Sequence, residues 1–239
     1  RDGSIPSDNP IPGSYIYSKG HRNIQGLAFG KGNLYASEHG LNEDEINLLR
    51  PSQNYGWPGV EGWANLSSEL KFNADSACVE PMFVFNNTST AGDKAPSGMI
   101  YYDHPLIPSL RSSLLVGTLN ANGRDISQFV LNAKGDSIIS TSTYFRNQFG
   151  RIRDLAQSPD GRIFFCTSNK DQYGAAVLKP GDDKIYEIKP IGYTATFDRE
   201  TNPIKLYPNP ATTQVQIQIP NDWRDLTMQI TNTEGKLYY

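Results

Sequence analysis

Three stretches of the sequence repeat the same order of apolar run, turn and apolar run, which constrains the fold more than any other feature. The copies begin at Gly26, Gly98 and Asp154, about 56 to 72 residues apart. Common propeller blades repeat every ~40–50 residues, so long loops would account for the excess. An antiparallel sandwich would also contain many short strands, but it would not require three copies. We favour a β-propeller, of which three repeats are too few to close a ring.

The composition also favours strands over helices. The 239 residues include 13 Tyr, 10 Phe, 21 Gly and 16 Pro, and the mean hydropathy is −0.52. No segment shows sustained helical periodicity, so we expect an all-β fold. The predicted strands are Tyr15–Ser18, Gly26–Phe29, Asn33–Ser37, Glu45–Leu49, Met82–Phe85, Gly98–Tyr102, Leu114–Thr118, Ile126–Leu131, Ile152–Ala156, Arg162–Thr167 and Lys184–Ile188.

Charge and hydropathy exclude two classes of partner. The net charge is −3 and no run is dense in Lys or Arg, so nucleic acid is not an expected partner. No stretch reaches the roughly 18 apolar residues that cross a bilayer, and the first 12 residues lack the apolar core of a signal peptide. We therefore expect neither a membrane span nor an export signal at the start of this chain.

The sequence changes character near residue 190. Residues 1–190 carry the strand repeats, 191–205 are typical of a linker, and 206–239 form a second segment. Within it, Val215, Ile217 and Ile219 alternate with glutamines, which predicts a strand with one buried face. A second strand is predicted at Leu226–Thr231. Two or three strands cannot stand alone, so this second domain is expected to be truncated.

The two cysteines, Cys78 and Cys166, are too far apart in sequence to indicate a metal knuckle or a disulfide framework. Cys166 lies in the apolar run 163–166, where we expect a buried, inert thiol. Cys78 lies in a polar stretch and is either free or paired outside this sequence.

Polar groups gather at two consecutive strand ends. His21, Arg22 and Asn23 precede one predicted strand, and His39 with the acidic residues 43–45 follows the next. The acidic residues lie near Gly40, where backbone carbonyls could join carboxylates around Ca²⁺. A solvated acidic turn is the alternative. Zinc is disfavoured because no third His or Cys lies at ligand spacing.

Two arginines mark a later strand. Arg151 and Arg153 are two positions apart, so in a regular strand they share a face. Two guanidinium groups on one face can bind a multiply anionic ligand. The alternative is a pair of surface arginines in salt bridges. His104 is expected to be a loop residue.

Several motifs, in order, resemble the soluble glucose/sorbosone (aldose) dehydrogenases that depend on pyrroloquinoline quinone (PQQ). The resemblance covers roughly Arg1 to Pro190. It rests on Asp2–Pro10, Gly20–Asn23, Gln25–Phe29, Ser37–Gly40, Asp44–Leu48, Asn54–Pro58, Arg151–Asp154 and Ser158–Gly161. It implies a six-bladed β-propeller, of which about three blades are present here.

The resemblance also implies roles for individual residues. Arg22 and Asn23 would contact the quinone carbonyls, and Arg22 would stabilise the negative charge that develops as hydride arrives. The quinone would lie beside His39 and Asp44, and its carboxylates would bind Arg151 and Arg153. Asn120 occupies the position at which the family presents a lysine to the cofactor. His21 is expected to be a hydrogen-bonded structural residue rather than the catalytic base.

The resemblance implies two calcium sites. The carbonyls of Gly40 and Leu41 would ligate the calcium that polarises the cofactor. A second, structural calcium would be held by Glu45, by the backbone oxygens of Tyr55, Glu61 and Trp63, and by Asn65, which stands where an Asp ligand is expected. The family's catalytic base is a histidine of its N-terminal half. Because nothing before Arg1 is present, we expect this chain alone to be inactive.

The end of the chain resembles a second family. The segments 206–212, Val215–Ile217 and Ile230–Lys236 resemble the sorting domain of type IX secretion in Bacteroidota, an immunoglobulin-like β-sandwich. The resemblance implies contact with the type IX secretion machinery and export to the cell surface or the medium.

Together these features predict a secreted oxidoreductase that oxidises an aldose at its anomeric carbon to the lactone. PQQ and Ca²⁺ would be the cofactors, and electrons would pass to an external acceptor. The alternative is a non-catalytic propeller that binds glycans or proteins at the cell surface. A hydrolytic propeller is weaker, since no Ser-His-Asp arrangement is evident.

Overall fold

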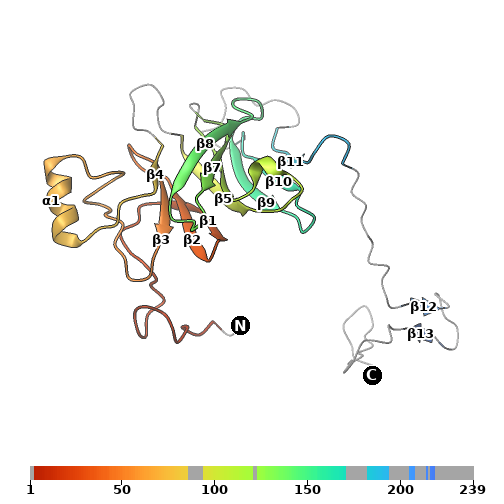
Figure 1. Ribbon diagram of the computed structural model, residues 1–239, viewed down its shortest axis with the longest axis horizontal. Coiled ribbons are helices and arrows are strands. Elements are labelled where there is room, and N and C mark those ends of the chain that lie inside the picture. The colour runs from red at the N-terminus through yellow and green to blue at the C-terminus, as the bar shows by residue number, and fades with distance from the viewer. Residues whose placement is uncertain are drawn as a thin grey trace. The chain divides into compact units, whose positions relative to one another are not determined.

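The computed structural model describes residues 3–85, 94–120, 123–170, 182–193, 205–207, 214 and 216–218. The chain divides into two compact units, Arg1–Ile191 and Gly192–Tyr239. Over these described residues, the first unit is built from antiparallel strands with one α-helix and one 3₁₀ turn (Figure 1), which confirms the predicted all-β fold. In the described part of the chain, no helix is both long and apolar enough to cross a membrane.

The described residues of the first unit form three antiparallel sheets. The first has the order β1 (Ile24–Gly30), β2 (Asn33–Glu38), β3 (Glu45–Leu49), β4 (Phe83–Val84). The second has the order β5 (Pro96–Tyr102), β6 (Ser113–Thr118), β7 (Ile126–Leu131), β8 (Ile138–Tyr144). The third has the order β9 (Ile152–Gln157), β10 (Ile163–Thr167), β11 (Ile185–Ile188).

Each sheet follows chain order from its first strand, as blades of a propeller do. β1, β5 and β9 therefore begin the three predicted repeats. In the first repeat, Lys31 and Gly32 both have positive φ values of 50° and 75°. This is the type I′ geometry that joins twisted strands in a two-residue hairpin, and Gly30 pairs with Asn33 across it.

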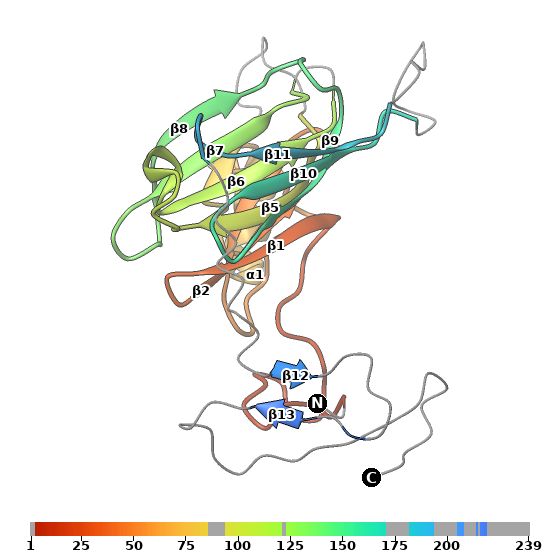
Figure 2. The same ribbon diagram turned by 90° about the vertical axis from the view of Figure 1, so that its right-hand side faces the viewer.

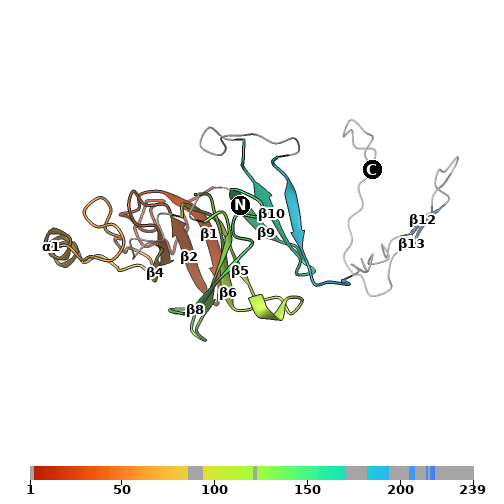
Figure 3. The ribbon, with the colours of Figure 1, turned by 90° about the horizontal axis from the view of Figure 1, so that it is seen from above.

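The sheets pack face to face, with the β5–β8 sheet between the other two (Figure 3). All of β6 is buried because its alternating side chains enter two different cores. Leu114 and Val116 pack toward the first sheet with Tyr35, Ile46 and Phe129. On the other face, Leu115 packs against the third sheet among Ile126, Ile152, Ile163 and Phe165.

Serine hydroxyls join the three sheets, from β2 to β5 and from β5 to β9, and the first strands β1, β5 and β9 lie side by side (Figure 2). The Ser37 hydroxyl donates to the Ser97 carbonyl at 2.7 Å, and the Ser97 hydroxyl donates to the Ile152 carbonyl at 2.7 Å. Gly26 permits this approach, since a Cβ there would lie 2.7 Å from the Ser97 carbonyl oxygen. These bonds fix the relative positions of the strand starts.

Replacing Ser97 with alanine should lower the free energy of unfolding by about 1–2 kcal/mol, because a buried hydrogen bond is lost. Chemical denaturation of the complete protein measures this change. Ser140→Ala, on the exposed strand β8, is the matched control and should change nothing measurable. Equal midpoints for the two variants would show that the bond between sheets does not stabilise the fold.

Three predictions of secondary structure are corrected. Tyr15–Ser18 is not a strand, and Tyr15 and Ile16 are exposed there. Strand β8 and helix α1 (Ser67–Ser76) were not predicted. β8 is an outer strand rich in Ser and Thr with no alternating burial, and α1 buries no residue at all. Neither therefore carries the periodic pattern that reveals an element.

Cys166 is half-buried rather than buried, because it lies on the face of β10 opposite Ile163 and Phe165. Cys78 is also half-buried, and both are free thiols.

In the second unit, β12 (Lys205–Tyr207) pairs antiparallel with β13 (Gln216–Gln218). Ile217 is 40% exposed, so the predicted buried face is not formed at this residue. The predicted strand Leu226–Thr231 lies outside the described residues.

Candidate functional site

The candidate residues lie along one edge of the three sheets. β1, β5 and β9 begin at this edge, and their partners β2, β6 and β10 end there. Hydrogen bonds near this edge join neighbouring blades. Asp44 accepts the amide of Ala95 at the start of β5, and Arg151 donates to the carbonyl of Leu119 just after β6. Residues far apart in sequence therefore form one surface.

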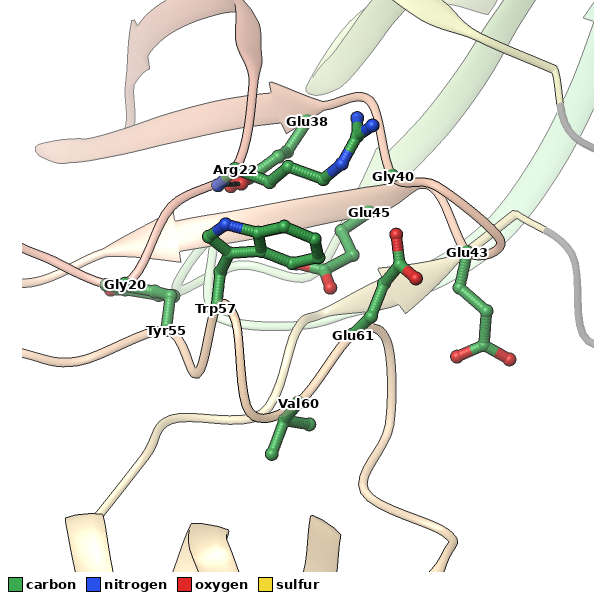
Figure 4. A pocket seen from close by; sticks show the side chains of 10 residues that line it. All are labelled: Gly20, Arg22, Glu38, Gly40, Glu43, Glu45, Tyr55, Trp57, Val60 and Glu61. Atoms are coloured by element: carbon green, nitrogen blue, oxygen red, sulfur yellow. Dashed lines mark hydrogen bonds between the residues drawn. The ribbon is translucent and has the colours of Figure 1, made fainter.

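Arg22 is held both at its backbone amide and at its guanidinium group. Its Nη1 donates to the His39 carbonyl at 2.8 Å, and its guanidinium lies 5.4 Å from the Trp57 ring centroid. Its backbone amide donates to the Glu38 carboxylate. Figure 4 shows the guanidinium over the Trp57 ring. An arginine held in this way presents a fixed positive charge at the strand edge.

Asn23 continues from Arg22 into β1. Its backbone amide donates to Glu38 Oε1 at 3.2 Å, and its side-chain oxygen accepts from Gln25 at 2.7 Å. Its carbonyl accepts the His39 amide at 2.9 Å. The structure thus brings Arg22, Asn23 and His39 together.

Asp44 is a buried anchor. Its Oδ1 accepts from His39 Nδ1 at 2.8 Å and from the Gly40 amide at 3.0 Å. Its Oδ2 accepts the amides of Lys94 at 2.9 Å and Ala95 at 2.8 Å. With the side chain only 1% exposed, these bonds make Asp44 a support for His39 and Gly40.

His21 is hydrogen-bonded, as the sequence predicts. Its Nε2 lies 2.9 Å from the Ser18 hydroxyl and its Nδ1 lies 3.0 Å from Glu38, while its ring stacks on Tyr55. His104 is a loop residue, also as predicted, and accepts the Leu106 amide.

The paired arginines differ in environment. Arg151 lies just before β9 and donates to the carbonyls of Leu119 at 3.1 Å and Ser168 at 3.2 Å. Arg153 is exposed and lies at a β-bulge between Ile152 and Asp154. The bulge leaves Arg153 and Asp154 both exposed, so regular alternation does not hold there.

Asn120 lies next to a lysine that the sequence analysis did not consider. The Asn120 amide donates to the Lys94 carbonyl at 3.0 Å. The Lys94 ammonium lies 3.1 Å from the fully buried Asp125 and 3.2 Å from the Ser127 hydroxyl. The charge of Lys94 is therefore paired with a buried carboxylate.

A small acidic cavity of about 10 Å³ lies beside Arg22, with room for one water-sized species. Burial above all, together with the nearby carboxylates of Glu38 and Glu61, raises the pKa of Glu45 to about 7, although hydrogen bonds from Asn47 and Gly62 act in the opposite direction. Burial, with Glu69 and Glu61 nearby, also raises the pKa of Glu43. The lining residues are Gly20, Arg22, Glu38, Gly40, Glu43, Glu45, Tyr55, Trp57, Val60 and Glu61.

The carboxylates of this cavity bind backbone amides. Glu45 accepts the Gly62 amide at 2.5 Å, and Glu61 accepts the amides of Leu41 and Asn42. In Figure 4 the Glu61 side chain extends toward Gly40, where a Cβ would lie 2.7 Å from its Oε1. Gly40 thus leaves the space that this carboxylate occupies.

The predicted metal ligands are only partly brought together. Gly40, Glu45, Tyr55 and Glu61 line the acidic cavity, whereas Leu41, Trp63 and Asn65 do not. Leu41 is exposed, and the Asn65 amide donates to Glu69 at the start of α1. Within the described ranges, no three His, Cys, Asp or Glu side chains converge as a metal site would require.

No role was predicted for Glu38 or Trp57 from the sequence, although both lie inside motifs that carry the family resemblance. Glu38 belongs to the segment Ser37–Gly40, and Trp57 to Asn54–Pro58. An acidic residue at the last position of a buried strand, directly before His39, was a signal for Glu38.

Comparison with known proteins identifies two families. The sequence model of the Glucose / Sorbosone dehydrogenase family matches residues 1–178. The model of the Secretion system C-terminal sorting domain matches residues 205–239.

Individual relatives agree with the family matches. Aldose sugar dehydrogenase YliI of Escherichia coli K12 is 30% identical over 189 residues, covering 74% of this chain and 48% of the relative. Quinoprotein glucose dehydrogenase B of Acinetobacter calcoaceticus is 51% identical over 81 residues, covering 32% of this chain and 17% of that protein. This chain spans about half the length of the first curated relatives it matches, 43% and 48%.

A solved structure shares the fold. The PQQ-bound form of aldose sugar dehydrogenase from Streptomyces coelicolor superposes with a TM-score of 0.61 at 33% identity. The match covers 79% of this chain and 49% of that one. The described sheets are thus consecutive blades of the kind of propeller that the sequence predicts.

Proposed function

Because the chain belongs to the glucose/sorbosone dehydrogenase family, we propose that it forms part of a PQQ- and calcium-dependent oxidoreductase that oxidises an aldose at its anomeric carbon to the lactone. The sugar loses two electrons and two protons in this reaction. When bound, PQQ supplies the oxidant and calcium supplies a Lewis acid that polarises it. The observation that carries the proposal is the set of hydrogen bonds that hold Arg22 and Asn23 in place beside His39 at the strand edge.

The donors at this edge fit an anionic quinone. Arg22 and Asn23 directly precede β1, Arg151 directly precedes β9 and Arg153 is its second residue, so cations and an amide lie at the starts of two blades that flank a third. Guanidinium groups bind carboxylates in a forked geometry. We assign Arg22 and Asn23 to the quinone carbonyls and Arg151 and Arg153 to the carboxylates. His39 lies beside the cofactor, supported from behind by Asp44.

Arg22 would act in catalysis through its fixed charge. Negative charge develops at the acceptor as hydride leaves the sugar. A guanidinium already held by the His39 carbonyl and the Trp57 ring needs no reorganisation to stabilise that charge. The conformational freedom that an exposed arginine side chain would have is therefore lost before the reaction begins.

The acidic cavity fits a calcium ion in part. Its lining carries four glutamates and one guanidinium, and Glu45 is buried with no ion pair to a Lys or Arg among the residues that the structure describes. Oxygen-only ligands around a cavity of this size suit Ca²⁺. We assign Glu45, Glu61 and the Tyr55 carbonyl to a structural calcium, and the Gly40 and Leu41 carbonyls to a calcium beside the quinone. The positions of Trp63 and Asn65 support the first assignment less well.

Calcium should stabilise the protein through Glu45. At about ten times its Kd, binding adds roughly 1.4 kcal/mol, which raises Tm by about 3–6 °C for a domain of this size. Glu45→Gln should lose most of this shift, whereas Glu187→Gln, an exposed carboxylate on β11, should keep it. A calcium shift that is equal in both variants would exclude Glu45 as a ligand.

Sugar-dependent reduction of a redox dye tests the proposed activity. The complete protein is supplied with PQQ and Ca²⁺ and assayed across common aldoses. We expect turnover that requires both the quinone and a sugar. An absence of turnover with every aldose, in protein shown to be folded, would contradict the proposal.

A second candidate function is a non-catalytic propeller that binds glycans or proteins. It is favoured by Asn120, which stands where a lysine is expected, and by Lys94, whose charge is paired with Asp125. A titration with PQQ separates the two functions. The enzyme should give a saturable absorbance change, and a binding module should give none.

The sorting domain at residues 205–239 indicates export to the cell surface or the medium. We propose that type IX secretion carries the protein out of the cell, where calcium is available and an external acceptor receives the electrons.

A further inference from the structure

Glu38, the last residue of β2, is a buried carboxylate with four hydrogen-bond donors around it. Its side chain is 5% exposed. Oε1 accepts the backbone amides of Arg22 and Asn23. Oε2 lies 3.0 Å from His21 Nδ1 and 3.4 Å from Asn47 Nδ2. A single carboxylate thus contacts three consecutive residues of the segment that precedes β1.

These contacts control the backbone from which Arg22 and Asn23 project. Residue 22 lies outside β1, and the β1–β2 pairing is irregular between Ile24 and Gly26. One backbone bond, from the His39 amide to the Asn23 carbonyl, joins this turn to the end of β2. The bonds to Glu38 satisfy the amides of Arg22 and Asn23 themselves, which matters because an N–H shielded from water without a partner is costly.

The arrangement fixes Arg22 from two adjacent residues of one strand end. Glu38 holds the Arg22 amide, and the carbonyl of the next residue, His39, holds the Arg22 guanidinium. A shift of the Glu38 side chain would therefore move the Arg22 backbone relative to the His39 carbonyl, which the Arg22 guanidinium contacts.

Glu38 also contacts the acidic cavity. It lines the cavity, and Asn47 Nδ2 lies between Glu38 Oε2 at 3.4 Å and Glu45 Oε2 at 2.8 Å. The carboxylate that holds Arg22 and Asn23 is thus one amide group away from the proposed calcium ligand.

We propose that Glu38 is the positioning residue of this site: its carboxylate holds the backbone amides of Arg22 and Asn23 so that their side chains meet the quinone together. The statement that these side chains meet the quinone rests on the proposed function. Glu38 acts through these two residues and does not itself contact cofactor or substrate.

Amide hydrogen exchange tests the positioning role without any quinone. In Glu38→Ala the amides of Arg22 and Asn23 should exchange at least about tenfold faster than in the wild type. Glu38→Gln keeps one oxygen for both amides, so its exchange should stay within roughly threefold of the wild type. Glu38→Asp, whose carboxylate is drawn back by one methylene, should behave like alanine and serves if the alanine variant does not fold.

The Phe129 amide, on β7 in the core between the first two sheets, reports global opening. Faster exchange at Arg22 and Asn23 with an unchanged Phe129 would support positioning. Exchange that is unchanged at Arg22 and Asn23, or that rises only in parallel with Phe129, would overturn it. Glu187→Gln, an exposed ion-pair partner on β11, should match the wild type at all three amides.

Quinone binding tests the functional part. We expect the Kd for PQQ to weaken at least about tenfold in Glu38→Ala or Glu38→Asp and to recover largely in Glu38→Gln. A Kd within roughly twofold of the wild type in a folded variant with fast Arg22 exchange would overturn the link to the cofactor. A wild-type protein that binds no quinone defeats the proposed function itself, while the exchange result still decides whether Glu38 holds the turn.

Discussion

Replacing Arg22 with alanine should lower kcat for sugar oxidation by roughly 10²–10³-fold at saturating PQQ. The guanidinium is held at 2.8 Å from the His39 carbonyl and lies over the Trp57 ring, so its charge is fixed before the reaction begins. Steady-state dye reduction at several quinone concentrations separates this loss in kcat from weaker cofactor binding.

Two further variants sharpen the Arg22 result. Arg22→Lys keeps the charge but not the forked donors, so it should fall between alanine and the wild type. Arg111→Ala removes an exposed arginine paired with Asp103 and should leave kcat unchanged. A kcat for Arg22→Ala within about threefold of the wild type would remove Arg22 from the catalytic machinery.

Replacing Asp44 with alanine should lower the free energy of unfolding by about 3–5 kcal/mol. The change removes the acceptor of three backbone amides, those of Gly40, Lys94 and Ala95, and of the His39 ring. Because these bonds join the first sheet to the start of β5, PQQ binding should weaken as well. Chemical denaturation of the complete protein gives the stability change.

Controls for Asp44 distinguish lost hydrogen bonds from lost charge. Asp44→Asn retains one acceptor oxygen and should be less destabilised than Asp44→Ala. Asp75→Ala removes an exposed carboxylate of α1 and should have no measurable effect. If Asp44→Ala and Asp75→Ala had the same denaturation midpoint, Asp44 would not be a structural anchor.

The strands that pack in the cores could be predicted from sequence because their alternation reports burial on one or both faces. β6 and β10 are examples, since Leu114 and Phe165 enter the two cores. Exposed elements carry no such signal, which explains why β8 and α1 were missed. The segment Tyr15–Ser18 shows the opposite error: it was predicted as a strand, but Tyr15, Ile16 and Tyr17 are exposed and the segment is not a strand.

The site could be predicted only as far as local sequence specifies it. Arg22, Asn23, His39 and Arg151, which belong to the motifs singled out in the sequence, lie along one edge of the described sheets. The direction of each side chain depends on contacts made across sheets. Asp44 turns toward Lys94 and Ala95 of the next blade, and the bulge in β9 changes the environment of Arg153. Such contacts depend on tertiary packing, so they could not be predicted from the local patterns of a single sequence.

The most direct test of the account is a single-turnover measurement under anaerobic conditions. The complete protein, saturated with PQQ and Ca²⁺, is mixed with an excess of aldose, and the quinone absorbance and the lactone formed are measured together. The account predicts loss of the quinone absorbance with one equivalent of lactone for each bound quinone. Saturable quinone binding with no absorbance change and no lactone, for any aldose, would contradict it.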